Sequence, residues 1–338
     1  MSPVPLYPLL LQPALHTKVW GGRRLETVLH IPLPTDEAYG EAWIMHDTSM
    51  VVNGALRGQS VGEVLRAYGQ QLVGPGNDPA IGMPLLAKFL DAREWLSIQV
   101  HPNDAQAREL ENEPRGKAEA WYIIATEPGS KLIIGVKPGS SLDELRQAIA
   151  ETRLEALVAY AEVTPGDVLF NTPGTIHALG PGILIYEIQQ SSDITYRLYD
   201  YGRPREIHVE KSLKVARTDV LPAIQHTGSD TSELVSIVSS EFFTTVLHQL
   251  RIGDYLRLDT GRTSFHILTS IEGDAVIEWG GGSTSVSGGS PSAPVGAATL
   301  GTSETVDLRM GQTVLIPASL GAYRVRGASR LLRSWQTG

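Results

Sequence analysis

The sequence predicts a mainly β protein built from two jelly-roll barrels with a helical insertion. Three observations carry this prediction. First, 34 glycines and 21 prolines bound many short apolar runs, which is typical of β-sandwiches and barrels. Second, only three segments have the apolar spacing of a helix. Third, two strand-turn segments resemble each other, which indicates a duplicated barrel.

Short runs of alternating or continuous apolar residues mark the predicted strands. They cover residues 41–46, 84–91, 95–101, 119–125, 131–136, 166–171, 183–190, 194–200, 242–250, 264–271, 274–279, 305–308 and 313–316. Glycine or proline bounds most of them, so short turns connect neighbouring strands.

The helical spacing is clearest where the insertion is predicted, at about 141–160. An apolar stripe that includes Leu145 and Ile149 runs along this segment. Ser140 or Ser141 can cap its start, with acidic residues in the first turn. The other two helical segments are 60–73 and 103–113.

A shift in composition near 220–232 predicts a joint between two β units. We expect a catalytic, metal-binding unit over 1–225 and a second β unit over 226–338. The Gly/Ser-rich stretch 280–303 predicts a loop of the second unit with no chemistry of its own.

The two units share one motif. Residues 166–179 (GDVLFNTPGTIHAL) resemble 311–325 (GQTVLIPASLGAYRV) in the order of glycine, apolar run, proline and turn. The first copy contains His177, whereas the second has no His, Asp or Glu nearby. We therefore expect the second barrel to lack a metal.

The charge balance disfavours some partners. The chain has 28 Lys and Arg against 37 Asp and Glu, a net charge of −9, and no basic run, so neither nucleic acid nor an anionic membrane is an expected partner. It has no cysteine, which excludes disulfides and thiolate ligands. The proline-broken N-terminal run is neither a typical signal peptide nor a membrane span, so we expect a cytoplasmic protein.

The most informative stretch is SIQVHP at 97–102. On a strand, Ser97, Gln99 and His101 share one face, opposite the apolar residues. Unpaired buried polar groups cost free energy, so this polar face predicts a metal or substrate site.

Two later segments complete a possible ligand set. Glu119 in GKAEAWYII shares a face with Lys117 and Trp121, and a Pro-Gly turn precedes His177 in PGTIHALG. One amide, one carboxylate and two imidazoles suit a divalent first-row metal such as zinc, with room for a water or substrate oxygen.

The order Gln-x-His, then Glu, then a Pro-Gly turn and His resembles the two cupin motifs, although cupins commonly have His where Gln99 stands. A more specific resemblance is to type I phosphomannose isomerases in their short bacterial form. It is carried by WGG (20–22), PLLAKFLDA (84–92), LSIQVHPND (96–104), GKAEAWYII (116–124) and the segment 174–203.

The resemblance implies two cupin-type jelly-roll barrels and one zinc per chain. It places Gln99, His101, Glu119 and His177 at the metal-ligand positions and Arg197 at the catalytic arginine. It also implies that Lys88 and Ser97 meet the substrate phosphate, with Arg203 as a looser candidate. The sequence departs from relatives at Ala118 and Ala120, whose side chains face away from Glu119.

The implied reaction interconverts mannose 6-phosphate and fructose 6-phosphate through an enediol. It needs a base near C1 and C2 and an electrophile near the oxygen. Lys117 and Glu187 are the candidate proton shuttles. Lys117 would need a lowered pKa, which the metal could supply, and we expect Arg197 to hold Glu187.

Two alternatives stay open at this stage. A metal-dependent cupin dioxygenase would use similar ligands, although Gln99 argues against the usual iron-binding sets. A non-enzymatic bicupin that binds sugar would leave Lys117, Glu187 and Arg197 without a shared task.

Overall fold

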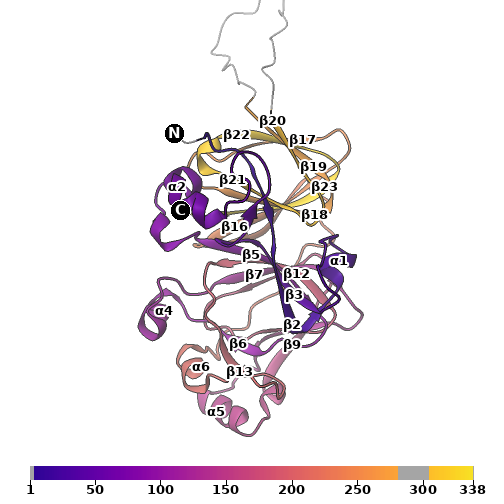
Figure 1. Ribbon diagram of the computed structural model, residues 1–338. Helices are drawn as coiled ribbons and strands as arrows, with labels where there is room; N and C mark the ends of the chain where they lie inside the picture. Colours follow the sequence, from indigo (N-terminus) through magenta and orange to yellow (C-terminus); the bar gives the residue numbers. More distant parts are fainter. Residues whose placement is uncertain (1–3, 281–303, 338) are drawn as a thin grey trace, which may run out of the picture.

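Two seven-stranded antiparallel sheets form the centre of the computed structural model, which describes residues 4–280 and 304–337. A smaller layer of strands covers the outer face of each sheet, so that two barrels lie one above the other (Figure 1). Each barrel buries its own interior, and the two large sheets bury a further core between them.

The first barrel carries the predicted site. Its large sheet contains, in spatial order, β14 (Gln225–His226), β10 (Asp167–Asn171), β7 (Glu119–Thr126), β12 (Ile183–Gln190), β5 (Leu85–Ala92), β2 (Ala14–Gly22) and β3 (Tyr39–Met45). Its smaller layer contains a sheet of β11 (Ala178–Leu179), β8 (Lys131–Val136) and β9 (Val158–Glu162), and a pair of β13 (Tyr196–Tyr199) and β6 (Ile98–Val100).

The second barrel has the same plan. Its large sheet contains β15 (Leu234–Ser239), β16 (Phe243–Leu250), β23 (Ser329–Gln336), β18 (His266–Gly273), β21 (Thr313–Ile316), β1 (Leu9–Gln12) and β4 (Met50–Val51). Its outer sheet contains β17 (Tyr255–Asp259), β22 (Ala322–Arg326), β19 (Ala275–Trp279) and β20 (Glu304–Leu308).

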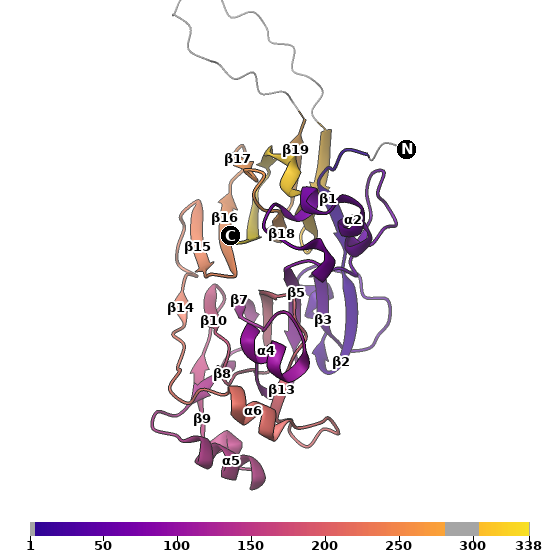
Figure 2. The ribbon, with the colours of Figure 1, turned by 90° about the vertical axis from the view of Figure 1, so that its left-hand side faces the viewer.

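The core between the two large sheets joins the barrels. Phe89 and Tyr186 enter it from the first barrel, and Phe243 and Phe265 from the second. Each is at most 1% exposed, and burial of such a side chain contributes about 1.5–3 kcal/mol. Side views show the two sheets stacked along the long axis of the molecule (Figure 2).

Strand β12 explains how charged side chains come to be buried. All eight of its residues are buried, because β7 and β5 flank it and a core lies on each face. One face, with Tyr186 and Ile188, packs into the core between the sheets. The other face turns Glu187 into the barrel interior, where it needs a partner.

Helices are few, and they lie around the barrels and at the lower end of the molecule (Figure 1). They are α1 (Arg24–Thr27), α2 (Val61–Tyr68), α3 (Gln70–Val73), α4 (Asp104–Glu111), α5 (Leu142–Ala150) and α6 (Val209–Val215), with 3-10 turns at Pro79–Ile81, Leu154–Ala156 and Ala318–Leu320. Within the described ranges, no helix is both long and apolar enough to span a membrane.

The mainly β fold with its barrels is confirmed, and each predicted strand coincides with an observed one to within a few residues. The sequence reasoning missed several strands, among them β2, β9, β17 and β23. Their alternation is weak: β17, for example, exposes or half-exposes all of its residues.

The predicted insertion at 141–160 is partly wrong. Ser141 caps α5, with its hydroxyl accepting from the Glu144 N–H. The helix ends at Ala150, and Thr152 takes a positive φ of 56° that stops it. The chain then forms β9, which pairs with β8. Similarly, Gly69 at φ 53° divides the predicted helix 60–73 in two.

The predicted division of the chain at residue 225 is not a clean cut in the structure. Strand β1 pairs with β21, as Leu9 lies opposite Leu315, and β4 extends the same sheet. The N-terminal strand therefore completes the second barrel rather than the first (Figure 2). Residues 281–303, most of the predicted Gly/Ser-rich loop, lie outside the described residues.

Candidate metal centre

Four side chains from three separate segments meet inside the first barrel. Gln99 lies on β6, and His101 follows that strand. Glu119 is the first residue of β7. His177 precedes β11, and its backbone exchanges two hydrogen bonds of 3.0 Å with Gln99. Strand register thus brings together residues up to 78 positions apart.

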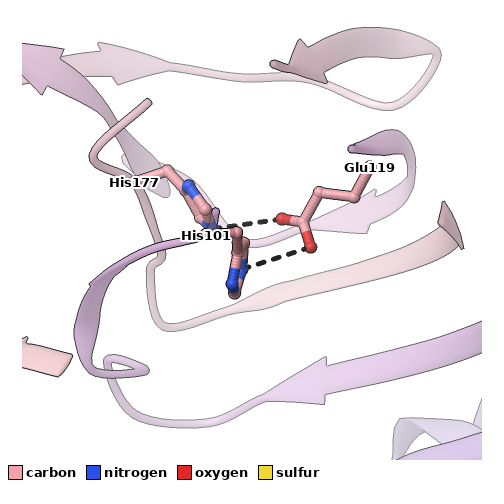
Figure 3. A group of neighbouring side chains, drawn as sticks. All are labelled: His101, Glu119 and His177. Atoms are coloured by element: carbon pink, nitrogen blue, oxygen red, sulfur yellow. Dashed lines mark ion pairs between the residues drawn. The ribbon is translucent and has the colours of Figure 1, made fainter. Parts of the chain in front are cut away.

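Three of these side chains form a compact cluster (Figure 3). His177 Nε2 lies 3.1 Å from Glu119 Oε1, and His101 Nε2 lies 3.5 Å from Glu119 Oε2. The candidate ligand atoms of the three residues all lie within 4.8 Å of one another. All three residues are buried, with at most 2% exposure.

The backbone fixes the orientation of both imidazoles. His101 Nδ1 lies 2.8 Å from the Ile194 carbonyl, and His177 Nδ1 lies 2.9 Å from the Thr175 carbonyl. A carbonyl only accepts, so each Nδ1 donates a proton, and each Nε2 faces the centre of the cluster as the candidate ligand atom. Burial, together with the charge of Lys117, lowers the pKa of His101 well below its usual value and keeps the ring neutral.

Gln99 lies beside both imidazoles. Its Nε2 is 3.5 Å from His101 Nε2 and 3.3 Å from His177 Nε2. The oxygen and nitrogen of an amide exchange places by a rotation of the side chain. When rotated, Gln99 presents Oε1 toward the Nε2 atoms of the two imidazoles.

The residues present fit a divalent metal. Two imidazoles, a carboxylate and an amide oxygen are ligands that such ions accept. Glu119 Oε2 is buried and makes no hydrogen bond of good geometry, and beside its ion pair with Lys117 it can accept a metal ion. Among residues 4–280 and 304–337, this is the only group of three or more His and acidic residues with such geometry.

Lys117 lies at the edge of the cluster, as predicted from its shared face with Glu119. Its Nζ is 2.9 Å from Glu119 Oε2 and 3.3 Å from His101 Nε2. Burial alone would lower the pKa of Lys117, but the charges of Glu119 and Glu187 outweigh it and raise the pKa. A proton shuttle at this position needs a lowered pKa in the metal-loaded protein. The raised pKa of Lys117 is therefore opposite to what that hypothesis requires.

The partner predicted for Glu187 was wrong. Lys88 Nζ lies 3.3 Å from Glu187 Oε1, and Trp121 Nε1 donates to Glu187 Oε2 at 2.9 Å. Lys88 and Glu187 face each other across β5 and β12, and both are buried. No ion pair joins Glu187 to Arg197 among the described residues.

Arg197 lies next to the cluster. It stands opposite Gln99 in the β13–β6 pair, and opposed residues of an antiparallel pair project from the same face. Its buried Nε has no hydrogen-bond partner in the part of the chain that the structure describes. This leaves a guanidinium available beside the metal centre.

The residues predicted for phosphate binding are not gathered in one place. Ser97 is buried, and its hydroxyl donates to Gln99 Oε1 at 3.3 Å, so it lies beside the metal ligands. Arg203 instead contacts Asp200, Glu94 and the Trp95 carbonyl. These partners already use its guanidinium, which weakens the prediction for Arg203.

The comparisons with known proteins agree with this geometry. A family model described as "Phosphomannose isomerase type I, catalytic domain" matches residues 9–128. A mannose-6-phosphate isomerase from Streptococcus mutans is 39% identical over 258 residues, which cover 72% of this chain and 79% of that protein. The chain belongs to the type I phosphomannose isomerase family.

Other members of the phosphomannose isomerase family support the assignment. The mannose-6-phosphate isomerase ManA of Bacillus subtilis is 36% identical over 225 residues, 64% of this chain and 70% of that protein. The crystal structure of mannose 6-phosphate isomerase from Bacillus subtilis superposes with a TM-score of 0.82 at 28% identity and covers 97% of this chain and 99% of that one. The resemblance and the cupin fold predicted from sequence are confirmed.

A cavity of about 590 Å³ lies in the first barrel unit of this chain, and its wall reaches the segment that orients His101. Ile194, whose carbonyl orients His101, lies in its wall together with Asp193. Arg115, His208 and Lys211 also line it.

Sequence reasoning missed two groups around the site. Asn171 lies opposite Glu119, and its Nδ2 donates to Glu119 Oε1 at 3.4 Å. Trp43 lies under Lys88, with 5.1 Å between Nζ and the ring centroid. Asn171 is the last residue of a predicted strand and shares a strand face with Leu169. Alternation along that strand could therefore have placed Asn171 in the barrel interior. Nothing local in the sequence pairs Trp43 with Lys88.

Proposed function

We propose that this protein interconverts mannose 6-phosphate and fructose 6-phosphate with one zinc ion held by His101, Glu119, His177 and Gln99. The observation that carries the proposal is the convergence of two backbone-oriented imidazoles on a buried carboxylate, in a chain of the phosphomannose isomerase family. Nitrogen and oxygen donors without thiolates suit zinc at a catalytic site.

A bound zinc ion would supply a Lewis acid and a point of attachment for substrate oxygen. The chain's own residues then have separate tasks. Arg197 directs its guanidinium toward the oxygen on which negative charge develops during enediol formation. Exclusion of water from the buried cluster strengthens this interaction.

We propose Lys117 and Glu187 as the two candidates for moving the proton between C1 and C2. Lys117 lies directly at the ligand cluster, 2.9 Å from Glu119. Glu187 lies one strand away, with both carboxylate oxygens already contacted by Lys88 and Trp121. Exchange of substrate C2 hydrogen with solvent, compared between Lys117→Met and Glu187→Gln, identifies the base.

We further propose that Ser97 and Lys88 bind the substrate phosphate and that Arg203 makes a smaller contribution. Ser97 lies on the strand of the metal ligands, and Lys88 supplies a buried cation on the neighbouring sheet. Loss of either should raise KM more than it lowers kcat, because the phosphate is remote from the reacting carbons.

We place the activity in the cytoplasm, where phosphorylated sugars are formed, and a net charge of −9 disfavours nucleic acid as a partner.

A coupled assay of mannose 6-phosphate conversion, with and without a chelator, tests the proposal. We expect turnover that chelation abolishes and zinc restores. Full activity in a metal-free preparation would remove the metal from the mechanism. Stoichiometric iron with oxygen consumption would instead identify a dioxygenase, and bound zinc without turnover would identify a sugar-binding protein.

A further inference from the structure

The second barrel repeats the architecture of the metal centre with different side chains. In the first barrel, Glu119 begins β7 and lies opposite Asn171, the last residue of β10. In the second, His266 begins β18 and lies opposite Ile316, the last residue of β21. His266 therefore occupies the position of Glu119.

The neighbouring strand gives a second correspondence. Glu187 on β12 lies opposite Trp121, two residues beyond Glu119 on β7. Arg333 on β23 lies opposite Leu268, two residues beyond His266 on β18. An arginine thus stands where the first barrel has a buried carboxylate, which reverses the charge of the position.

The turn after the repeated motif gives a third correspondence. His177 follows the turn after β10, and Tyr323 on β22 follows the turn after β21. Tyr323 is 3% exposed and packs in the interior core of the second barrel. Its hydroxyl lies 2.7 Å from His266 Nδ1, just as His177 contacts Glu119 in the first barrel.

These residues form one contiguous cluster in the second barrel. The Arg333 guanidinium lies 4.5 Å from the centroid of the Trp335 ring, and His266 packs 5.8 Å from the same ring. His248 on β16 lies opposite Leu331, and so projects from the same sheet face as Arg333. We call His248, His266, Tyr323, Arg333 and Trp335 the second-barrel cluster.

The second-barrel cluster has an unbalanced positive charge. Within residues 4–280 and 304–337, no carboxylate forms an ion pair with Arg333, whose buried Nε has no hydrogen-bond partner. Residues 1–3, 281–303 and 338 contain no Asp or Glu side chain. His248 is 4% exposed, and its Nε2 also has no partner in the described chain.

Both histidines of the cluster are neutral at pH 7. Burial, reinforced by Arg333, lowers the pKa of His266 to about 3 and that of His248 to about 4. Among the described residues, Arg333 and His248 are the charged or titratable groups that act on these rings, and Asp259 acts on Tyr323. Arg333 is half-buried, and no carboxylate pairs with it among the described residues, so its guanidinium is free to pair with an anion.

We propose that the interior of the second barrel is a binding site for the phosphate or carboxylate group of a small metabolite. Arg333 supplies the charge and two or more N–H donors in the planar fork that matches an oxyanion. Tyr323 and His248 supply neutral polar contacts, and Trp335 holds the guanidinium in place. The first barrel is proposed to hold a metal cation in its interior, and the exchange of the buried carboxylate for arginine suits the second barrel to an anion.

The fluorescence of Trp335 reports on this site without any need for turnover. Inorganic phosphate and, separately, acetate are titrated into the full-length protein, and the signal of a Trp335→Phe variant is subtracted. The titration is repeated in Glu119→Gln, which disables the proposed metal centre of the first barrel. Failure of the isomerase assay therefore leaves this test unaffected.

We expect a saturable Trp335 signal in the wild type and in Glu119→Gln. Arg333→Gln should weaken binding of the anion by at least about tenfold, since a charge-assisted contact is lost. Arg330→Gln, three residues earlier on β23 and paired with Glu272, is the matched control and should bind like the wild type. Binding of phosphate but not acetate would assign the ligand group as phosphate, and the reverse as carboxylate.

The absence of a saturable signal with either anion would overturn the proposal. So would unchanged binding in a folded Arg333→Gln variant. If Arg333→Gln fails to fold, Arg333→Lys and Tyr323→Phe take its place: both keep the packing, and we expect each to weaken binding. Unchanged affinity in both would exclude the second-barrel cluster as the binding site.

Discussion

Glu187 and Lys88 form a buried ion pair across two adjacent strands. Their Oε1 and Nζ atoms are 3.3 Å apart, and their residues are 3% and 4% exposed. The pair lies beside the metal centre, because Trp121, which donates to Glu187, also packs against the ring of His177. It thereby links the sheet that holds Lys88 to the ligand cluster.

Removal of one partner of this pair should be costly. Glu187→Gln keeps an acceptor for Trp121 but leaves Lys88 charged and buried, so we expect a loss of about 3–5 kcal/mol in the free energy of unfolding. The double variant Lys88→Met with Glu187→Gln should recover part of this loss. Urea denaturation measures both variants.

The exposed pair of Arg146 and Glu210 provides the control for that experiment. Glu210→Gln should leave the unfolding midpoint unchanged, since water screens exposed charges. Equal effects of Glu187→Gln and Glu210→Gln would show that the buried pair does not contribute as proposed.

Arg197 should act on turnover and not on metal binding. Arg197→Ala removes the guanidinium that opposes the developing oxyanion, and we expect kcat to fall by about 10²–10³. The zinc content, measured on the same preparation, should stay at that of the wild type. Arg217→Ala, in an exposed pair with Asp219, is the control. Joint loss of zinc and activity in Arg197→Ala would make the arginine structural.

Glu41 should make folding sensitive to acid. Burial raises the pKa of this carboxyl, but Lys88, Lys18 and the Trp43 indole together outweigh it and lower the pKa from 4.5 to about 2. A depressed carboxyl pKa stabilises the fold above pH 4.5, and this contribution is lost as the pH falls from 4.5 to about 2. Its size is about 3 kcal/mol.

The comparison of wild type with Glu41→Gln isolates this contribution. The difference between their free energies of unfolding should be largest above pH 5 and shrink as the pH approaches 2. Glu109→Gln, at an exposed position of α4, controls for the loss of one charge. A difference that stays constant with pH would show that Glu41 is not held ionised by its neighbours.

The two barrels should unfold together, because they share the core between their large sheets. Phe243 of the second barrel packs edge-on against Phe170 of the first, with ring centroids 6.1 Å apart. Phe243→Ala should cost about 3–5 kcal/mol and shift a single transition seen by calorimetry. Tyr255→Ala, at a residue 60% exposed, should have little effect. Two separated transitions would contradict a shared core.

Much of the fold and of the site could be predicted from local sequence. Strict alternation placed Ser97, Gln99 and His101 on one face, and the same rule placed Lys117 beside Glu119, where the structure has them 2.9 Å apart. These predictions hold because side-chain direction along a strand depends only on position in the strand.

Only the tertiary structure decided which residues meet across strands. Glu187 pairs with Lys88 and not with Arg197, Ile194 orients His101 from 93 residues away, and Leu9 completes the sheet of Leu315. Strand order and register set these contacts, and neither is written in the spacing of any one segment. The sequence by itself determined the candidate ligand types and the faces that carry them, whereas strand order and register inside the first barrel decided their partners, because a charge buried in the barrel interior is costly unless it is paired.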